Sequence, residues 1–281
     1  MNYTTLISAA ELSQLAGRPG LALVDCRFEL ADPDWGFEEY QQLHIPGAVY
    51  AHLDRELSAE KTPATGRHPL PRPADFEQVA ARLGISNTSQ VICYDTVGGA
   101  FAARLWWLLK YFGHDAAAVL DGGLSAWLKA GYPTREGVET APPGQFTASV
   151  RAELAASLEE VDSIRTSPDR VLVDARTAER YRGEVEPIDR VAGHIPGAVN
   201  RFHQLNLNAD MTMKAPEQLR DEFTALLKGL HPRQAVVYCG SGVTSCHHLL
   251  AMEHAGLTGA RLYPGSYSEW ITDPTRPVAK G

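Results

Sequence analysis

The sequence of 281 residues contains one pattern twice, and this duplication constrains the fold more than any other feature. The hexapeptide His-Ile-Pro-Gly-Ala-Val stands at 44–49 and again, unchanged, at 194–199. Three further matches keep the same order: Ser-x-x-Glu followed by Leu-Val-Asp-x-Arg, an apolar strand, and a turn that leads to Trp127 or Trp270. Agreement of four segments in order indicates that one fold unit is repeated.

Each half is predicted to be an α/β domain. Short apolar runs at 21–24, 91–94 and 117–120, bounded by turn residues, are typical of buried parallel strands. Helical patterns such as 100–112 alternate with them, and Ser8 with Glu11 predicts a capped helix start. We therefore expect two tandem domains, each a mainly parallel sheet with helices on both faces.

The stretch from Gly131 to Ser149 is rich in proline, glycine and threonine and shows no periodicity, which indicates a linker. We expect an N-terminal domain at 1–135, a linker at 136–148 and a C-terminal domain at 149–281.

Composition narrows the function. The net charge of −8 and the scattered basic residues argue against nucleic acid as a partner. No apolar run approaches the roughly 20 residues of a membrane span, and no signal-peptide pattern opens the sequence, so we expect a cytoplasmic protein. The four cysteines form no disulfide framework, and the spacing of Cys239, Cys246, His247 and His248 matches no zinc pattern. We expect reduced thiols and no metal.

The duplication separates structural residues from chemical ones. A feature present in both halves belongs to the fold, and a feature of one half is a candidate for chemistry. By this criterion we expect structural roles for the paired histidines, aspartates and tryptophans (His44 and His194, Asp25 and Asp174, Trp127 and Trp270). The aspartates, each followed two residues later by arginine, are predicted to form buried ion pairs.

Cys239 is the main feature found in one half alone. It ends a strand and begins a glycine-rich loop, Gly240-Ser241-Gly242-Val243-Thr244, whereas Asp95 holds the equivalent place in the first half. Free loop amides and the positive end of the following helix favour a thiolate there, and the thiolate is the nucleophilic form of cysteine. The alternative is a small buried packing residue. We favour the reactive interpretation and expect the first half to be catalytically inert.

The other cysteines have simpler interpretations. Cys26 and Cys93 lie in or beside strands and are predicted to be packing residues. Cys246 is expected on the helix after the loop, where only its proximity to Cys239 suggests oxidative regulation.

At the Cys239 loop the sequence resembles the tandem rhodanese-like sulfurtransferases, in particular the 3-mercaptopyruvate sulfurtransferases. The resemblance covers nearly the whole chain and includes the His-Ile-Pro-Gly-Ala turns and the segment Tyr263-Pro-Gly-Ser-Tyr-Ser-Glu-Trp270. It implies that Arg180 binds the carboxylate of the donor, as a guanidinium fork can. A second arginine is expected shortly before the second His-Ile-Pro-Gly turn. Arg190 is the nearest candidate, although it lies closer to His194 than the family pattern requires.

The resemblance also implies a relay of Ser241, His68 and Asp54. Counted from the His-Ile-Pro-Gly turns, His68 and Asp54 correspond to Gln218 and Gln204 in the second half, so this pair occurs in one half only.

The activity implied is a double displacement without a cofactor. Cys239 takes sulfur from 3-mercaptopyruvate as a persulfide and passes it to a thiol such as thioredoxin, or to cyanide. Thiosulfate is the alternative donor, but sulfurtransferases suited to it carry two basic residues directly after the cysteine, where this chain has Gly240 and Ser241. A cysteine phosphatase needs an arginine six positions after its cysteine, where this chain has Ser245. A non-catalytic binding module is disfavoured because Cys239 is retained.

Overall fold

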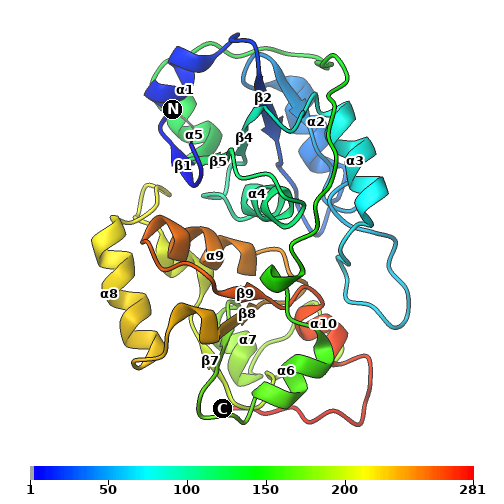
Figure 1. Cartoon of the computed structure of the whole chain (residues 1–281), viewed down its shortest axis with the longest axis vertical. Helices are drawn as coiled ribbons and strands as arrows, with labels where there is room; N and C mark the ends of the chain where they lie inside the picture. Colours follow the sequence, from blue (N-terminus) through cyan, green and yellow to red (C-terminus); the bar gives the residue numbers. More distant parts are fainter. Residues whose placement is uncertain (1–2) are drawn as a thin grey trace. The chain divides into compact units, whose positions relative to one another are not determined.

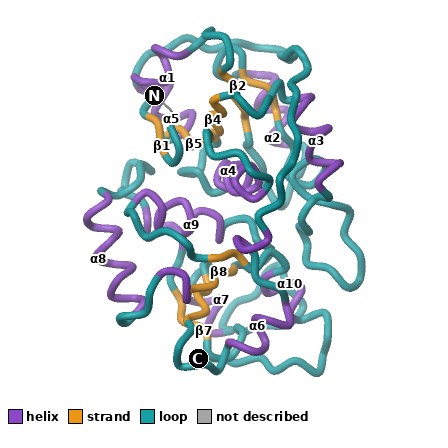
Figure 2. The backbone as a smooth tube through the Cα atoms, in the orientation of Figure 1, coloured by secondary structure: helices purple, strands orange, loops and turns teal. Residues whose placement is uncertain are grey.

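The computed structural model describes residues 3–281, which divide into two compact units. The first contains the residues up to Ala59 together with Leu70–Arg151 and Leu207–Met213. The second contains Glu60–Pro69, Ala152–Asn206 and Lys214–Gly281. Each unit thus includes one short segment from the opposite half of the sequence. Figure 1 follows the chain from end to end, and Figure 2 shows short strands alternating with helices and loops.

The first unit is built on a five-stranded parallel sheet in the order β1-β5-β4-β2-β3. Its strands are β1 (Leu6–Ile7), β2 (Leu21–Asp25), β3 (Ala48–Tyr50), β4 (Gln90–Tyr94) and β5 (Ala117–Leu120). Its helices are α1 (Ala9–Leu15), α2 (Trp35–Gln42), α3 (Pro73–Arg82), α4 (Ala102–Tyr111) and α5 (Gly123–Lys129). Ser8 and Glu11 form the predicted capping box at the start of α1.

Helices cover both faces of this sheet. One core joins Leu12 of α1 and Trp127 of α5 to Leu23, Ile92 and other strand residues. Successive strand side chains point to opposite faces. Helix α4 lies against β4 and β5, and its side chains are not among those of this core, so it covers the opposite face. The predicted α/β layering is therefore confirmed.

The second unit repeats this plan with four parallel strands in the order β7-β6-β8-β9. Its strands are β6 (Val171–Asp174), β7 (Ala198–Asn200), β8 (Ala235–Tyr238) and β9 (Arg261–Leu262). Its α-helices are α6 (Leu158–Ile164), α7 (Ala178–Arg182), α8 (Pro216–Leu227), α9 (Ser245–His254) and α10 (Ser266–Trp270). The short 3-10 helices are η1 (Ala152–Leu154), η2 (His203–Asn206) and η3 (Pro232–Gln234). A single parallel bridge between Ala155 and Leu262 stands where the first unit has β1.

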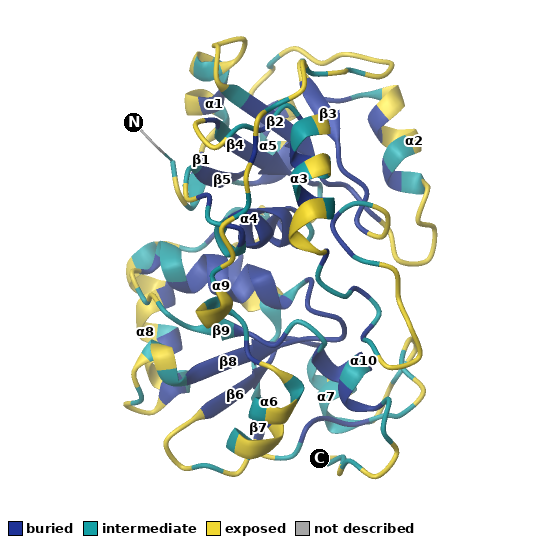
Figure 3. Cartoon of the chain, turned by 45° about the vertical axis from the view of Figure 1, so that its right-hand side comes forward, coloured by how far each residue is buried: buried dark blue, intermediate teal, exposed yellow. Residues whose placement is uncertain are grey.

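Burial follows the sheets in both units, whose central strands β2, β4, β6 and β8 carry mainly the buried colour in Figure 3. Trp127 and Trp270 are buried, and their indole N–H groups donate to the carbonyls of Pro133 and Pro277. Both tryptophans therefore anchor the fold, as the duplication predicts.

Candidate active site

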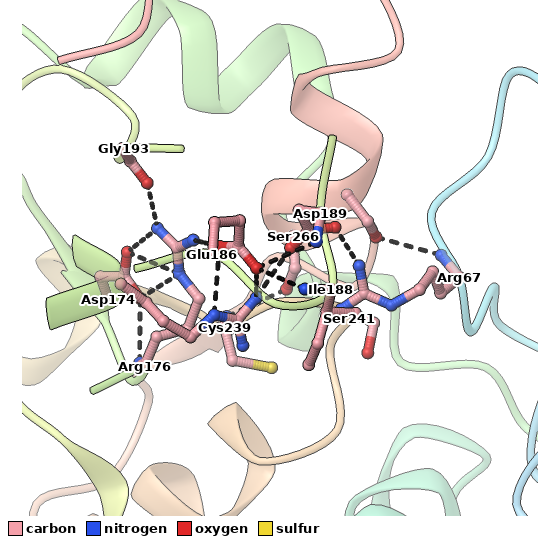
Figure 4. A network of polar contacts seen from close by, with 12 residues as sticks. Arg67, Asp174, Arg176, Glu186, Ile188, Asp189, Gly193, Cys239, Ser241 and Ser266 are labelled. Carbon is pink, nitrogen blue, oxygen red and sulfur yellow. Dashed lines mark hydrogen bonds and ion pairs between the residues drawn. The ribbon is translucent and has the colours of Figure 1, made fainter. Parts of the chain in front are cut away.

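The residues shared by both halves form structural contacts. In the second unit the Arg176 guanidinium pairs with Asp174 at 2.7 Å and donates to the carbonyl of Gly193 (Figure 4). In the first unit Arg27 contacts Asp25 and the carbonyl of Leu43 in the same way. These buried pairs join the end of a strand to the His-Ile-Pro-Gly turn.

The two repeated histidines also hold these turns. The Nδ1 atom of His44 lies 2.8 Å from the carbonyl of Tyr40, and that of His194 lies 2.7 Å from the carbonyl of Tyr181. Each imidazole stacks on the same tyrosine ring. The predicted structural role of these histidines is confirmed.

Cys239 directly follows β8 and lies at the base of a polar loop. The N–H of Gly242 donates to its Sγ at 3.2 Å, and the Ser245 hydroxyl lies 3.4 Å from the same sulfur. Its own N–H donates to the Ser266 hydroxyl at 3.1 Å. The side chain is 2% exposed, but hydrogen-bond donors surround the sulfur.

This setting lowers the pKa of Cys239. Burial alone raises it, because a charge is hard to solvate in the interior. Hydrogen bonds from the hydroxyls of Ser245 and Thr244 and from the amides of Ser241 and Ser245 act in the opposite direction and prevail. The thiolate, which is the nucleophilic form, is therefore stabilised.

The loop depends on glycine at 242. Gly242 has a φ of 77°, a conformation that side chains rarely adopt, and a Cβ there would collide with the carbonyl of Pro264. Only glycine lets the loop close around the sulfur with its amide turned inward.

The equivalent loop of the first unit already holds an anion. The Asp95 carboxylate accepts hydrogen bonds of 2.8–2.9 Å from the N–H groups of Val97, Gly99, Phe101 and Ala102. The carboxylate thus occupies the place of the thiolate and satisfies the loop amides. This loop offers no nucleophile, which agrees with the expectation that the first half is inert.

Two members of the predicted relay meet in the second unit. His68 Nδ1 and Ser241 Oγ lie 2.7 Å apart, and both side chains are buried. The segment that carries His68 is fixed by the N–H of Arg67, which donates to the Ser268 hydroxyl at 3.0 Å. Asp54 belongs to the first unit, where its side chain is exposed and its N–H donates to His52 Nδ1 at 3.1 Å. Its place in the relay stays a prediction.

Arg180 lies beside the Cys239 loop. A Cβ built on Gly240 would lie 3.7 Å from its guanidinium nitrogens. The same guanidinium pairs with Glu186 at 2.8 Å and with Asp189 at 2.9 Å. Arg190, the second predicted arginine, instead donates to the carbonyl of Ile271. Its role toward the donor stays a prediction.

Sequence reasoning missed Arg67. Its guanidinium pairs with Asp189, and a Cβ built on Gly240 would lie 2.6 Å from its Nη2. Arg67 is thus the nearer of the two arginines to this glycine, which directly follows Cys239. Its position next to His68 in the sequence was the one available signal.

The remaining cysteines are buried and form no disulfide within residues 3–281. Cys246 lies on α9 as predicted, and its thiol donates to the carbonyl of Gly242 at 3.3 Å. His247 and His248 both lie within hydrogen-bond distance of the Asn206 side chain. Among residues 3–281 no group of three or more His, Cys, Asp or Glu side chains is arranged to hold a metal ion.

Fold and site together define a class: a duplicated parallel α/β protein with one activated cysteine, in its second half. The profile of the rhodanese-like domain matches residues 8–130 and 157–273. The chain therefore belongs to the rhodanese family and is a sulfurtransferase with two tandem rhodanese-like domains.

Individual relatives agree with this assignment. The chain is 47% identical over 283 residues to a probable 3-mercaptopyruvate sulfurtransferase of Pseudomonas aeruginosa, covering 100% of both chains. It is 40% identical to a putative thiosulfate sulfurtransferase of Mycobacterium tuberculosis, with 98% of this chain and 97% of the relative covered. The crystal structure of a 3-mercaptopyruvate sulfurtransferase from Escherichia coli matches with a TM-score of 0.82 and 31% identity, covering 95% of this chain and 100% of that one.

No helix within residues 3–281 has the length and apolar character needed to span a membrane.

Proposed function

We propose that the protein moves sulfur from 3-mercaptopyruvate through a persulfide on Cys239 to a thiol acceptor. The observation that carries the proposal is the position of Cys239 in a loop whose amides and hydroxyls donate to its sulfur and lower its pKa. The relative from Pseudomonas aeruginosa, named as a probable 3-mercaptopyruvate sulfurtransferase, supports this donor.

In the first step the Cys239 thiolate attacks the sulfur of 3-mercaptopyruvate. A sulfur–sulfur bond forms, and the carbon–sulfur bond breaks with its electron pair left on carbon, so that pyruvate departs as its enolate. The enolate then gains a proton to become pyruvate. Ser241, hydrogen-bonded to His68, is the proton carrier in this proposal, and Asp54 is the third member of the relay.

In the second step an acceptor thiolate attacks the outer sulfur of the persulfide. The sulfur–sulfur bond breaks, and Cys239 leaves as the thiolate that the loop stabilises. A dithiol such as thioredoxin then forms its own disulfide and releases sulfide, whereas cyanide becomes thiocyanate. We place the reaction in the cytoplasm, where such reduced thiols are abundant and where cysteines outside disulfides, like these four, persist.

The donor's carboxylate is assigned to the arginines beside the loop. Arg180 and Arg67 both lie next to Gly240, and guanidinium groups bind carboxylates with two parallel hydrogen bonds. Arg190 is held by the carbonyl of Ile271 and is assigned a lesser part.

Thiosulfate is the second candidate donor, because a relative from Mycobacterium tuberculosis is named as a putative thiosulfate sulfurtransferase. Gly240 and Ser241 supply no positive charge directly after the cysteine, which favours the monoanionic carboxylate donor.

Steady-state kinetics with both donors test the proposal. We expect a higher kcat/KM for 3-mercaptopyruvate than for thiosulfate, and loss of both activities in Cys239→Ser. Cys246→Ser is the matched control, since it removes a second thiol near the loop. Pyruvate release by Cys239→Ser at the parent rate would rule the mechanism out.

A further inference from the structure

A carboxylate bridges the two arginines beside the Cys239 loop. Asp189 pairs with Arg67 through one oxygen (Figure 4). It pairs with Arg180 through the other oxygen at 2.9 Å. The Asp189 side chain is 3% exposed, so water screens its charge only weakly. A negative charge of the protein itself therefore lies where an anionic donor must approach.

The turn that carries Asp189 is firmly held. The Glu186 carboxylate accepts from the N–H groups of Ile188 and Asp189 and also pairs with Arg180. Arg176, fixed by Asp174, contacts Glu186 at 3.4 Å. Asp189 thus belongs to a connected network, and its carboxylate cannot swing away without breaking its charged contacts with Arg67 and Arg180.

The charges of this network balance. It contains the three arginines Arg67, Arg176 and Arg180 and the three acids Asp174, Glu186 and Asp189. Burial raises the pKa of Asp189, with the nearby Glu186 acting in the same direction and Arg67 and Arg180 opposing them. Because this site has no surplus positive charge, a donor with one negative charge binds at a lower free-energy cost than a donor with two.

A small cavity adjoins the bridge. It has a volume of about 230 Å³, and its lining includes Lys61, Arg67, Asp189, Arg190, Ser268 and Ile271. A Cβ built on Gly240 of the catalytic loop would lie 2.6 Å from Arg67 Nη2, and Arg67 also lines this cavity, so this arginine adjoins both.

We propose that Asp189 is a specificity-determining residue, which selects monoanionic carboxylate donors over the thiosulfate dianion at the Arg67–Arg180 pair. This inference rests on the proposed function, because it concerns the donor of the same cysteine. Each negative charge of the donor is repelled by Asp189, so a dianion is penalised twice. Arg67 acts as a donor-binding residue.

Asp189→Asn tests the charge while keeping the shape of the side chain. We expect kcat/KM to rise roughly tenfold for 3-mercaptopyruvate and roughly a hundredfold for thiosulfate, which shifts the donor ratio about tenfold toward thiosulfate. Asp221→Asn, which removes an exposed acid of α8, is the control for net charge and should leave the ratio unchanged. An unchanged ratio in Asp189→Asn, or weaker use of both donors, overturns the inference.

Arg67→Gln tests the cationic side of the bridge. We expect KM to rise about tenfold or more for both donors. Arg72→Gln, which removes an exposed arginine of the first unit, is its control. An unaltered KM in Arg67→Gln would show that this arginine does not meet the donor.

A binding measurement separates this inference from the sulfur chemistry. Calorimetric titration of Cys239→Ser with pyruvate and with thiosulfate, with and without Asp189→Asn, requires no persulfide. We expect the second substitution to tighten thiosulfate binding more than pyruvate binding. If neither donor loads sulfur on the parent protein, the proposed function fails, while this titration still decides whether Asp189 discriminates by charge. Equal tightening of both anions, or none, overturns the inference.

Discussion

Removal of the Ser245 hydroxyl should raise the pKa of Cys239. The hydroxyl lies 3.4 Å from the sulfur and is the first of the hydrogen-bonding groups that stabilise the thiolate against burial. A hydrogen bond to a charged group contributes about 1.5–3 kcal/mol, and about 1.36 kcal/mol corresponds to one pKa unit. The contact is long, so we expect the lower end of this range, a rise of about one unit in Ser245→Ala.

The direction of the pH dependence follows from the pKa of Cys239 in the folded protein. Because the parent thiol has a lowered pKa, the thiolate fraction is retained as the pH falls until that pKa is reached. In Ser245→Ala the thiolate fraction begins to fall at higher pH. Below the pKa values of both proteins, the variant's Cys239 should react about tenfold more slowly than that of the parent.

The assay is the rate of iodoacetamide alkylation at Cys239 against pH, followed on the tryptic peptide so that the other thiols do not contribute. Ser13→Ala, which removes a hydroxyl on the surface of α1, is the matched control. If the alkylation midpoint of Ser245→Ala coincides with that of the parent, the account of thiolate stabilisation is refuted.

Three further predictions concern other parts of the site and fold. Gly240→Ala places a Cβ against the Arg67 guanidinium, so the KM for the donor should rise severalfold while the alkylation midpoint of Cys239 stays unchanged. A shifted midpoint would argue against the assignment of this effect to Arg67 and the donor. Asp95→Asn presents an amide N–H to loop amides that need an acceptor, so the free energy of unfolding, measured by urea denaturation, should fall by about 2–4 kcal/mol while the folded protein keeps its kcat. An unchanged free energy of unfolding would contradict the role of this carboxylate. His68→Gln should slow pyruvate release in single-turnover experiments more than it slows cyanide-dependent discharge of the persulfide, whereas equal slowing would remove His68 from the donor step.

The repeat made most of the fold predictable from the sequence. Burial of short apolar runs and the capping box at Ser8 are local features, and the structure confirms both. Comparison of the halves also isolated Cys239 and Asp95 as the positions that differ, and the structure places both in equivalent loops. The meeting of His68 with Ser241 was predicted through the family resemblance rather than through any pattern in the residues.

Contacts between distant segments were not predictable. The bridge of Arg67, Asp189 and Arg180 requires that residues 60–69 join the second unit, which no local propensity encodes. The same limit applies to Arg190, whose contact with the carbonyl of Ile271 depends on the packing of the C-terminal segment. Charged residues in loops have no periodicity that reports their partners.

Peptide mass spectrometry after a single turnover tests the central claim most directly. The parent protein, mixed with one equivalent of 3-mercaptopyruvate and then alkylated, should carry one added sulfur atom on Cys239, with an equal amount of pyruvate released. Pyruvate without added sulfur, or sulfur found on Cys26, Cys93 or Cys246 instead, would contradict the account.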